Sequence, residues 1–222
     1  DMHYDAEVSL GQNTDTIVFT AKSIAKQYPK LKNYNMLYIP NGIDSEHFIT
    51  CNKELPIEYK SIPSPRAIYV GAIEEWFDID LVYKSAVANP EFSFVLIGKS
   101  GINLVALEKL KNVFILGTRP YNTVCNYLYF SDIGMIPFKK NEFTHTINPL
   151  KVYEYLASGL NVVSVNLAEL ICMKEFCNLA EDDHQFIEMI SHTKQIDSQK
   201  IDTFLSENDW LEKLKIILDK TL

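Results

Sequence analysis

Residues 66–98, RAIYVGAIEEWFDIDLVYKSAVANPEFSFVLIG, decide the fold because they contain a complete strand–helix–strand unit. Residues 66–71 and 92–97 are short runs rich in β-branched and aromatic residues; the first ends on Gly71 and the second is followed by Gly98. Residues 79–88 between them have a helical pattern. This spacing predicts two parallel strands joined by a right-handed helical crossover.

The same alternation extends in both directions along the chain. Further strands are expected at 15–20, 36–39, 113–116, 133–137 and 162–165, and further helices at 21–28, 104–110, 121–130, 150–158, 168–176, 183–193 and 209–220. The alternation predicts an α/β fold with a doubly wound, Rossmann-like parallel sheet. Ligands bind at the carboxyl ends of such strands, so the loops after Val70, Ile97, Leu116 and Ile136 are expected to carry the site.

Composition and charge narrow the function classes. The 222 residues are 47% hydrophobic and 23% charged, as in ordinary globular chains. The formal net charge of −8 disfavours nucleic acid as a main partner, because phosphate backbones repel an acidic chain. No apolar run approaches the roughly 20 residues of a membrane span. The opening residues lack a secretory-leader pattern and are typical of the middle of a protein.

The four cysteines are Cys51, Cys125, Cys172 and Cys177. They form no CxxC pair, and no histidine lies at metal-ligand spacing from them. We therefore expect four reduced thiols in a cytoplasmic protein, each serving as a small core residue, and no metal site.

Residues 148–159, NPLKVYEYLASG, contain the strongest local signal. Asn148 is a favoured N-cap, Pro149 suits the first helical position, and Gly159 suits the C-terminal stop. Such a helix points free N–H groups and a partial positive charge at a ligand in front of it, which suits a diphosphate. Lys151 and Glu154 would share one helix face, where the carboxylate could accept two ribose hydroxyls. The alternative is a surface salt bridge between the two residues.

Several stretches together resemble the C-terminal domain of GT-B glycosyltransferases of the GT4-like group (glycosyltransferase group 1). They are IPNGID at 39–44 with Phe48, which is similar to the interdomain signature; YVG at 69–71, similar to the first strand and glycine turn; NVFILG at 112–117, similar to the strand before the base pocket; the stretch 148–159 with Val162 and Val163, similar to the donor-site helix and next strand; and DWL at 209–211, similar to the start of the last helix. The resemblance covers nearly the whole chain in the right order.

The resemblance implies roles for the matching residues. Glu154 would hold the ribose hydroxyls, and Lys151 with the helix N-terminus would hold the diphosphate. Gly71 would let the backbone approach the phosphates, and Thr118 and Arg119 would border the base. No catalytic residue is assigned. The expected donor-binding residues are Gly71, Thr118, Arg119, Asn148, Pro149, Leu150, Lys151 and Glu154.

The sequence departs from the family at two places. Many members have a second glutamate eight positions before the one matched by Glu154, where this chain has Thr146. Many also have an arginine and a lysine after the first glycine turn, where this chain has AIEEWFD at 72–78. Asp78 suits the N-cap of the next helix. The WFD pattern is similar to a branch acting in bacterial surface-polysaccharide assembly.

The resemblance implies a division into residues 1–35, the end of an N-terminal acceptor domain; 36–206, a nucleotide-sugar-binding domain; and 207–222, a helix crossing back. It implies a glycosyltransferase without a cofactor beyond its donor, a UDP-sugar before a GDP-sugar. The acceptor, a glycan or lipid-linked sugar, would be bound through the N-terminal domain, and the protein could sit peripherally at the cytoplasmic membrane. The alternatives are a non-catalytic or degenerate nucleotide-binding module and a nucleotide-sugar epimerase.

Overall fold

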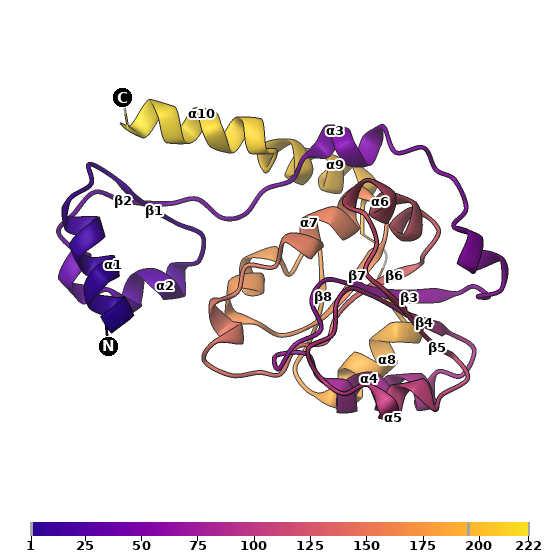
Figure 1. The fold of residues 1–222 in the computed structure, drawn as a ribbon. Helices are drawn as coiled ribbons and strands as arrows, with labels where there is room; N and C mark the ends of the chain where they lie inside the picture. The colour runs from indigo at the N-terminus through magenta and orange to yellow at the C-terminus, as the bar shows by residue number, and fades with distance from the viewer. Residues whose placement is uncertain (1, 195, 222) are drawn as a thin grey trace.

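The chain folds into a small N-terminal lobe and a large α/β lobe joined by an extended segment, as a computed structural model shows for residues 2–194 and 196–221 (Figure 1). Residues 1 and 222 of the two expected end segments lie outside the described residues. Within the described ranges, no helix is long and apolar enough to cross a membrane.

The helices and strands follow the expected alternation closely. The strands are β1 (Ile17–Phe19), β2 (Met36–Tyr38), β3 (Arg66–Val70), β4 (Ser93–Ile97), β5 (Val113–Gly117), β6 (Ile133–Ile136), β7 (Asn161–Val165) and β8 (Asn178–Ala180). The α-helices are α1 (Met2–Gln12), α2 (Lys22–Gln27), α3 (Ser45–Ile49), α4 (Ile79–Ala88), α5 (Val105–Glu108), α6 (Tyr121–Tyr129), α7 (Leu150–Ala157), α8 (Asp183–Ser191), α9 (Ser198–Glu207) and α10 (Trp210–Thr221). Short 3₁₀ helices are η1 (Pro29–Leu31), η2 (Ile57–Lys60), η3 (Thr144–Thr146) and η4 (Ala168–Met173).

The large lobe is built on a six-stranded sheet in the order β5-β4-β3-β6-β7-β8, with every neighbouring pair parallel. Helices α4, α5 and α8 cover one face and α6 and α7 the other (Figure 1). Strands β3, β4, β6 and β7 are almost entirely buried, as expected for a sheet covered on both faces. The predicted doubly wound α/β fold is confirmed. The chain reverses its direction of winding between β3 and β6, so these two neighbours flank the topological switch point.

Two expected helices differ from the structure. The helix expected at 104–110 is the single short turn α5. The helix expected at 168–176 is the 3₁₀ helix η4, ending at Met173. Leu167, Leu170 and Met173 are all buried, with exposed fractions of 0%, 0% and 3%. This spacing of three matches the three residues per turn of a 3₁₀ helix, so each turn places an apolar side chain on the same buried line.

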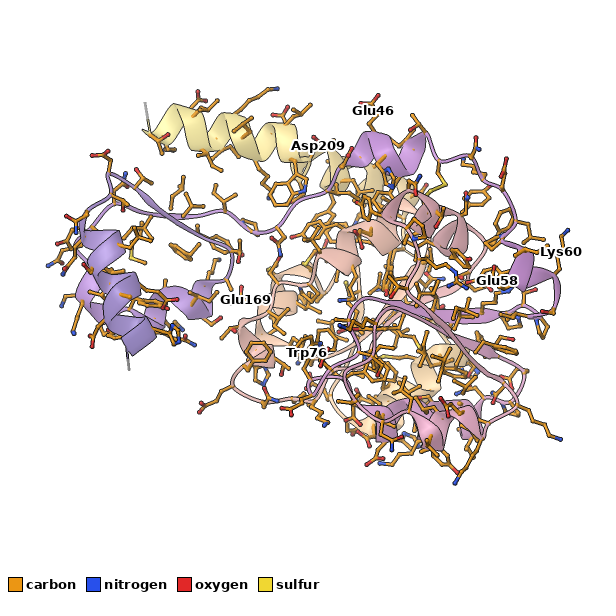
Figure 2. All side chains as sticks on the ribbon, in the orientation of Figure 1. Glu46, Glu58, Lys60, Trp76, Glu169 and Asp209 are labelled. Carbon is orange, nitrogen blue, oxygen red and sulfur yellow. A yellow bond between two sulfur atoms is a disulfide. The ribbon has the colours of Figure 1, made fainter. Side chains whose placement is uncertain are left out.

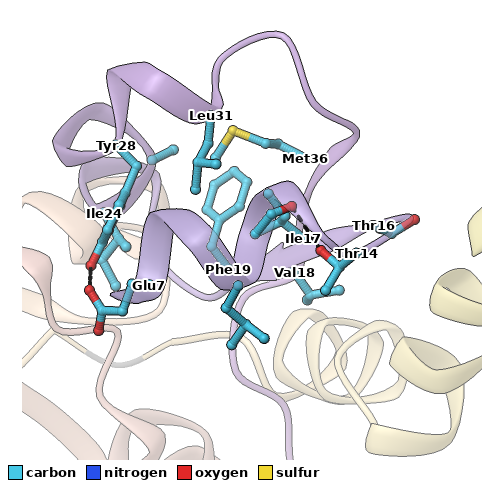
Figure 3. Close-up of a pocket in the computed structure, with 13 residues that line it drawn as sticks. Glu7, Thr14, Thr16, Ile17, Val18, Phe19, Ile24, Tyr28, Leu31 and Met36 are labelled. Atoms are coloured by element: carbon cyan, nitrogen blue, oxygen red, sulfur yellow. Dashed lines mark hydrogen bonds between the residues drawn. The ribbon is translucent and has the colours of Figure 1, made fainter. Parts of the chain in front are cut away.

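The small lobe consists of α1, α2 and η1 around the parallel pair β1–β2. Leu31, Ile17 and Met36 help to line an apolar cavity of about 360 Å³ between these elements (Figure 3). The expected domain boundary at residue 35 falls between the paired strands β1 and β2, and the small lobe extends to Tyr38. This cavity lies away from the carboxyl ends of the large sheet, where a ligand is expected.

Two contacts tie the lobes together near residues 39–43. Asn41 and Asn148 exchange hydrogen bonds: Asn148 Oδ1 accepts from the Asn41 backbone N–H at 3.1 Å, and Asn41 Nδ2 donates to Asn148 O at 2.6 Å. Ile43 pairs with the segment before α10, because its N–H donates to Asn208 O at 3.0 Å and its carbonyl accepts from Trp210 N at 2.9 Å. The two passages of the chain between the lobes therefore run side by side.

A third tie is the carboxylate of Glu169, on η4 of the large lobe (Figure 2). It accepts hydrogen bonds from the backbone N–H groups of Lys22 and Ser23, at 3.2 and 3.1 Å, and from the Ser23 hydroxyl at 2.7 Å. The N-cap position of α2, Ala21, supplies no side-chain cap. Glu169 therefore caps α2 from the other lobe, satisfying N–H groups that a helix start leaves free.

The cysteines depart from expectation. Cys51 and Cys125 form a disulfide with their Cα atoms 6.1 Å apart, so the expectation of four reduced thiols is wrong for this pair. Cys51 follows α3 and Cys125 lies on α6, 74 residues later, and tertiary packing brings them together. Cys172 and Cys177 are free, the first exposed and the second buried.

Candidate functional site

Lys151 places a cation at the switch point of the large sheet. Its Nζ lies 5.3 Å from the ring centroid of Tyr69 at the end of β3, and 5.1 Å from that of Phe138 after β6. Gly71, with φ +143°, follows β3, and a Cβ added there would lie 3.3 Å from Lys151 Cε and Nζ. The structure thus brings together two residues expected to share the diphosphate, at the strand ends where such sheets bind ligands.

Lys151 is half-buried and takes part in none of the ion pairs found among the described residues. Burial lowers the pKa of Lys151 to about 8, and the negative charge of Glu154 offsets this effect in part. A lysine whose ammonium is desolvated in this way is stabilised by any anion that reaches it. The site therefore suits a negatively charged ligand such as a phosphate.

Glu154 lies one turn further along α7 and is also half-buried. Burial raises the pKa of the Glu154 carboxyl, while Lys151, His47 and a hydrogen bond from Tyr121 act in the opposite direction. The ion pairs in the described part of the chain do not include Lys151 with Glu154. The alternative of a surface salt bridge between them is therefore wrong, and the carboxylate keeps its accepting capacity.

The start of the donor helix differs from the expectation. Pro149, with ψ 118°, occupies the N-cap position of α7, and it offers no side-chain cap. The expected N-cap, Asn148, lies one residue earlier and is buried. Its amide oxygen accepts from the Asn41 backbone and from the Tyr153 hydroxyl, at 3.1 and 3.4 Å. Competition from these two donors explains why Asn148 anchors the lobe junction instead of capping the helix, whose first residue is the half-exposed Leu150.

A second glycine controls the approach of the loops at the switch point. A Cβ added to Gly98, after β4, would lie 1.9 Å from the carbonyl oxygen of Gly71. Gly98 also has φ +147°, where side chains are rarely accommodated. Asp78 caps α4 as expected, its Oδ1 accepting from Leu81 N at 2.9 Å. The loop after β3 is therefore rigidly placed, although it lacks basic residues.

Known proteins share this architecture. No protein-family profile matches the chain. The chain is 26% identical over 214 residues to the putative teichuronic acid biosynthesis glycosyltransferase TuaH of Bacillus subtilis strain 168, covering 91% of this chain and 53% of that protein. The solved sucrose-phosphate synthase of Thermosynechococcus elongatus superposes with a TM-score of 0.74 at 15% identity, covering 97% of this chain and 60% of that one.

The chain has the fold of the C-terminal half of a GT-B glycosyltransferase. Two further solved structures agree: a trehalose-6-phosphate structure from E. coli bound with UDP-2-fluoro glucose (TM-score 0.67, 11% identity, 98% of this chain, 60% of that one) and WaaG, a glycosyltransferase of lipopolysaccharide biosynthesis (0.59, 14%, 91% and 58%). The chain spans about half the length of its curated relative and about three fifths of these solved chains.

The two residues expected to border the base directly follow β5. Thr118 is exposed and Arg119 follows β5, the edge strand two positions from β3. The Arg119 guanidinium donates to Glu58 at 2.6 Å and to the Tyr127 hydroxyl at 2.9 Å (Glu58 is labelled in Figure 2). These partners hold the guanidinium in place from η2 and α6. The structure does not bring Arg119 into contact with Lys151, and its role at a base stays a prediction.

Two aromatic residues beside Glu154 have no counterpart among the expected site residues. His47 on α3 stacks on Tyr121 of α6, with ring centroids 4.6 Å apart and planes 12° from parallel. Both interact with the Glu154 carboxylate. A histidine directly before Phe48 and a tyrosine directly after Pro120 give no sequence signal for this arrangement. Folding alone brings α3, α6 and α7 together.

Proposed function

We propose that this GT-B half binds a nucleoside diphosphate sugar at Lys151 and Glu154, and that it belongs to a glycosyltransferase. The observation that carries the proposal is the position of the Lys151 ammonium, held at the switch point against Tyr69, Phe138 and Gly71. The diphosphate lies against Lys151 and the first turn of α7, and the ribose hydroxyls lie against Glu154. Asn148, Pro149 and Leu150 shape this helix start, and Thr118 and Arg119 border the base.

The chemistry follows from where charge develops. When an acceptor hydroxyl attacks the anomeric carbon, the bond to the diphosphate breaks and negative charge accumulates on the leaving oxygens. Lys151 and the N-terminal dipole of α7 stabilise that charge, which lowers the barrier. The proposal needs no cofactor beyond the donor, with a UDP-sugar preferred to a GDP-sugar.

The biological role is proposed from the relatives. The curated relative is named for teichuronic acid biosynthesis and one solved neighbour for lipopolysaccharide biosynthesis. We propose transfer to a glycan or lipid-linked acceptor during bacterial surface-polysaccharide assembly, at the cytoplasmic face of the membrane. The small lobe, which extends to Tyr38, would belong to the acceptor-binding half, and the large lobe to the donor-binding half. The chain alone should bind donor nucleotide while transferring sugar poorly or not at all.

Calorimetric titration of the chain with UDP, GDP and ADP tests the donor site. We expect one nucleotide to bind, UDP first. Lys151→Ala and Glu154→Ala should each weaken that binding by roughly 1–3 kcal/mol, because each removes a charge-assisted contact.

Two matched variants serve as controls. Lys84→Ala removes an exposed lysine paired with Asp183, and Glu46→Ala removes an exposed acid on α3, so neither should change the affinity. If the chain binds no nucleotide, the site is either incomplete without an N-terminal acceptor half or absent. Titrating a protein that also contains that half distinguishes the two explanations. If neither it nor the chain binds any nucleotide, the proposal is wrong and the fold serves a non-catalytic module.

A further inference from the structure

The Glu154 carboxylate is influenced by residues from three helices that are separated in the sequence. Glu154 lies on α7, His47 on α3 and Tyr121 at the first position of α6. Burial is the main effect on the pKa of Glu154 and raises it, whereas His47 and Tyr121 lower it by favouring the carboxylate form. The two aromatic residues therefore favour the ionised form of Glu154 from other helices, against the effect of burial.

The His47 imidazole is fixed by packing. Its ring stacks on Tyr121 and meets Phe48 edge-on, with ring centroids 5.0 Å apart. Asp44 caps α3 by accepting a hydrogen bond from the His47 backbone at 3.1 Å, which fixes the helix that carries the ring. A stacked and capped ring of this kind has little freedom to turn away from α7.

One nitrogen of this fixed ring has no partner. His47 Nε2 is buried and makes no hydrogen bond to the described residues. Buried polar atoms are nearly always satisfied, so such an atom beside a carboxylate indicates a site whose hydrogen bonding is completed by something that is absent.

We propose that His47 and Tyr121 are positioning residues that orient the Glu154 carboxylate toward the adjacent hydroxyls of a ribose, and so make the site prefer ribonucleotides to 2′-deoxyribonucleotides. The inference rests on the proposed function, because it assumes that Glu154 faces the ribose. The Tyr121 hydroxyl stabilises the carboxylate, and the His47 ring stacks on Tyr121 from α3, a helix that packs against α7. A carboxylate held in one orientation accepts two neighbouring hydroxyls at once, which a freely rotating group does less well.

The test compares UDP with 2′-deoxy-UDP, or GDP with 2′-deoxy-GDP if GDP is the tighter ligand. The unmodified chain should bind the ribonucleotide about ten times more tightly, the size of one charge-assisted hydrogen bond. Tyr121→Phe keeps the stacked ring and removes the hydroxyl. His47→Phe keeps the stack and removes the nitrogens. Each should weaken ribonucleotide binding severalfold and leave 2′-deoxynucleotide binding almost unchanged.

A merely structural role gives another pattern, because a disturbed site loses affinity for both nucleotides equally. Tyr129→Phe is the matched control, since Tyr129 lies at the far end of α6 and packs on Phe130. It should leave the ratio of the two affinities as it is. Nucleotide binding with a ratio unchanged by Tyr121→Phe and His47→Phe overturns the inference and leaves the proposed function standing. Absence of any nucleotide binding overturns both.

Discussion

Lys151 combines a functional position with a cost in stability. Its ammonium is buried against Tyr69 and Phe138, and its pKa is about 8 in the folded chain compared with an ordinary 10.5. A desolvated cation whose charge is offset only in part by Glu154 destabilises the fold. The residue that we assign to the diphosphate is therefore one that the fold alone would not favour.

Replacing Lys151 with methionine should accordingly stabilise the chain while weakening nucleotide binding. Near pH 7 we expect the free energy of unfolding to rise by roughly 1–3 kcal/mol, because a buried charge is replaced by an apolar chain of similar length. Between the folded pKa of about 8 and the unfolded value of 10.5, the unfolded chain binds more protons than the folded one. The contribution of Lys151 to stability therefore rises with pH across this window, and the advantage of methionine should shrink.

Urea unfolding of both proteins at about pH 7 and about pH 10 measures this difference. Lys84→Met, at an exposed position on α4, should show no pH-dependent gain. A methionine variant that is less stable than the unmodified chain near pH 7 would show that Lys151 is satisfied in the folded state.

At the residue scale, the sequence predicts the two site residues on α7 and the glycine after β3. Lys151 and Glu154 fall together because their spacing of three is a local property, and Gly71 joins them because strand ends meet at one edge of the sheet. His47 and Tyr121 could not be predicted, since their contact depends on how α3 and α6 pack. Asn148 was assigned the wrong partner because a local rule for helix caps could not include the amide of Asn41.

At the scale of elements, the short helix α2 depends on the other lobe for its start. Glu169, buried with an exposed fraction of 6%, accepts two backbone N–H groups and one hydroxyl from Lys22 and Ser23. Glu169→Ala removes all three bonds at once. We expect the free energy of local opening of α2 to fall by roughly 2–4 kcal/mol, since hydrogen bonds to a charged group contribute more than neutral ones.

Hydrogen exchange at the Lys22 and Ser23 amides measures this opening. Both should exchange faster in Glu169→Ala, while the amides of β3 and β4 should keep their rates. Glu175→Ala, at an exposed acid shortly after η4, is the control and should change neither set. Unchanged exchange at Lys22 and Ser23 would mean that water caps α2 as well as Glu169 does.

Helices and strands with a clear hydrophobic pattern were predicted well, whereas those without such a pattern were missed. Strands β3 to β7 follow apolar runs, and α4 was placed at its observed bounds. Helix α9 was missed because its sequence, SQKIDTFLSE, is mostly polar and buries none of its residues, although Phe204 stacks on Tyr153 and Phe176. Strand β8 is three residues long and pairs with β7 alone. Such elements form because a neighbour is present.

At the scale of the whole molecule, the Cys51–Cys125 bond links the segment after α3 to α6 and so closes a long loop. A cross-link across 74 residues restricts the unfolded chain, and Cys51→Ser should lower the free energy of unfolding by about 2–4 kcal/mol under oxidising conditions. The effect should disappear when both proteins are measured with a reducing agent. Cys172→Ser is the control, because Cys172 is exposed and free.

Thermal unfolding of the three proteins with and without reductant checks the expectation. Equal stability of Cys51→Ser and the unmodified chain under oxidising conditions would show that the bond does not form in solution. The overall fold class was predictable from the alternation of strands and helices, whereas this covalent link between distant segments was not.

The parallel bridge between Ile43 and Asp209 also fixes where α10 begins relative to the connecting segment (Asp209 is labelled in Figure 2). Backbone hydrogen bonds from both sides of Ile43 hold the connecting segment against the residues at the start of α10. Helix α10 begins directly after this bridge and extends toward the small lobe, as Figure 1 shows. The position of α10 is therefore set at Trp210, whose backbone N–H bonds to Ile43. A displacement of α10 would therefore reach the junction that also holds Asn41 against Asn148, one residue before the N-cap of the donor helix.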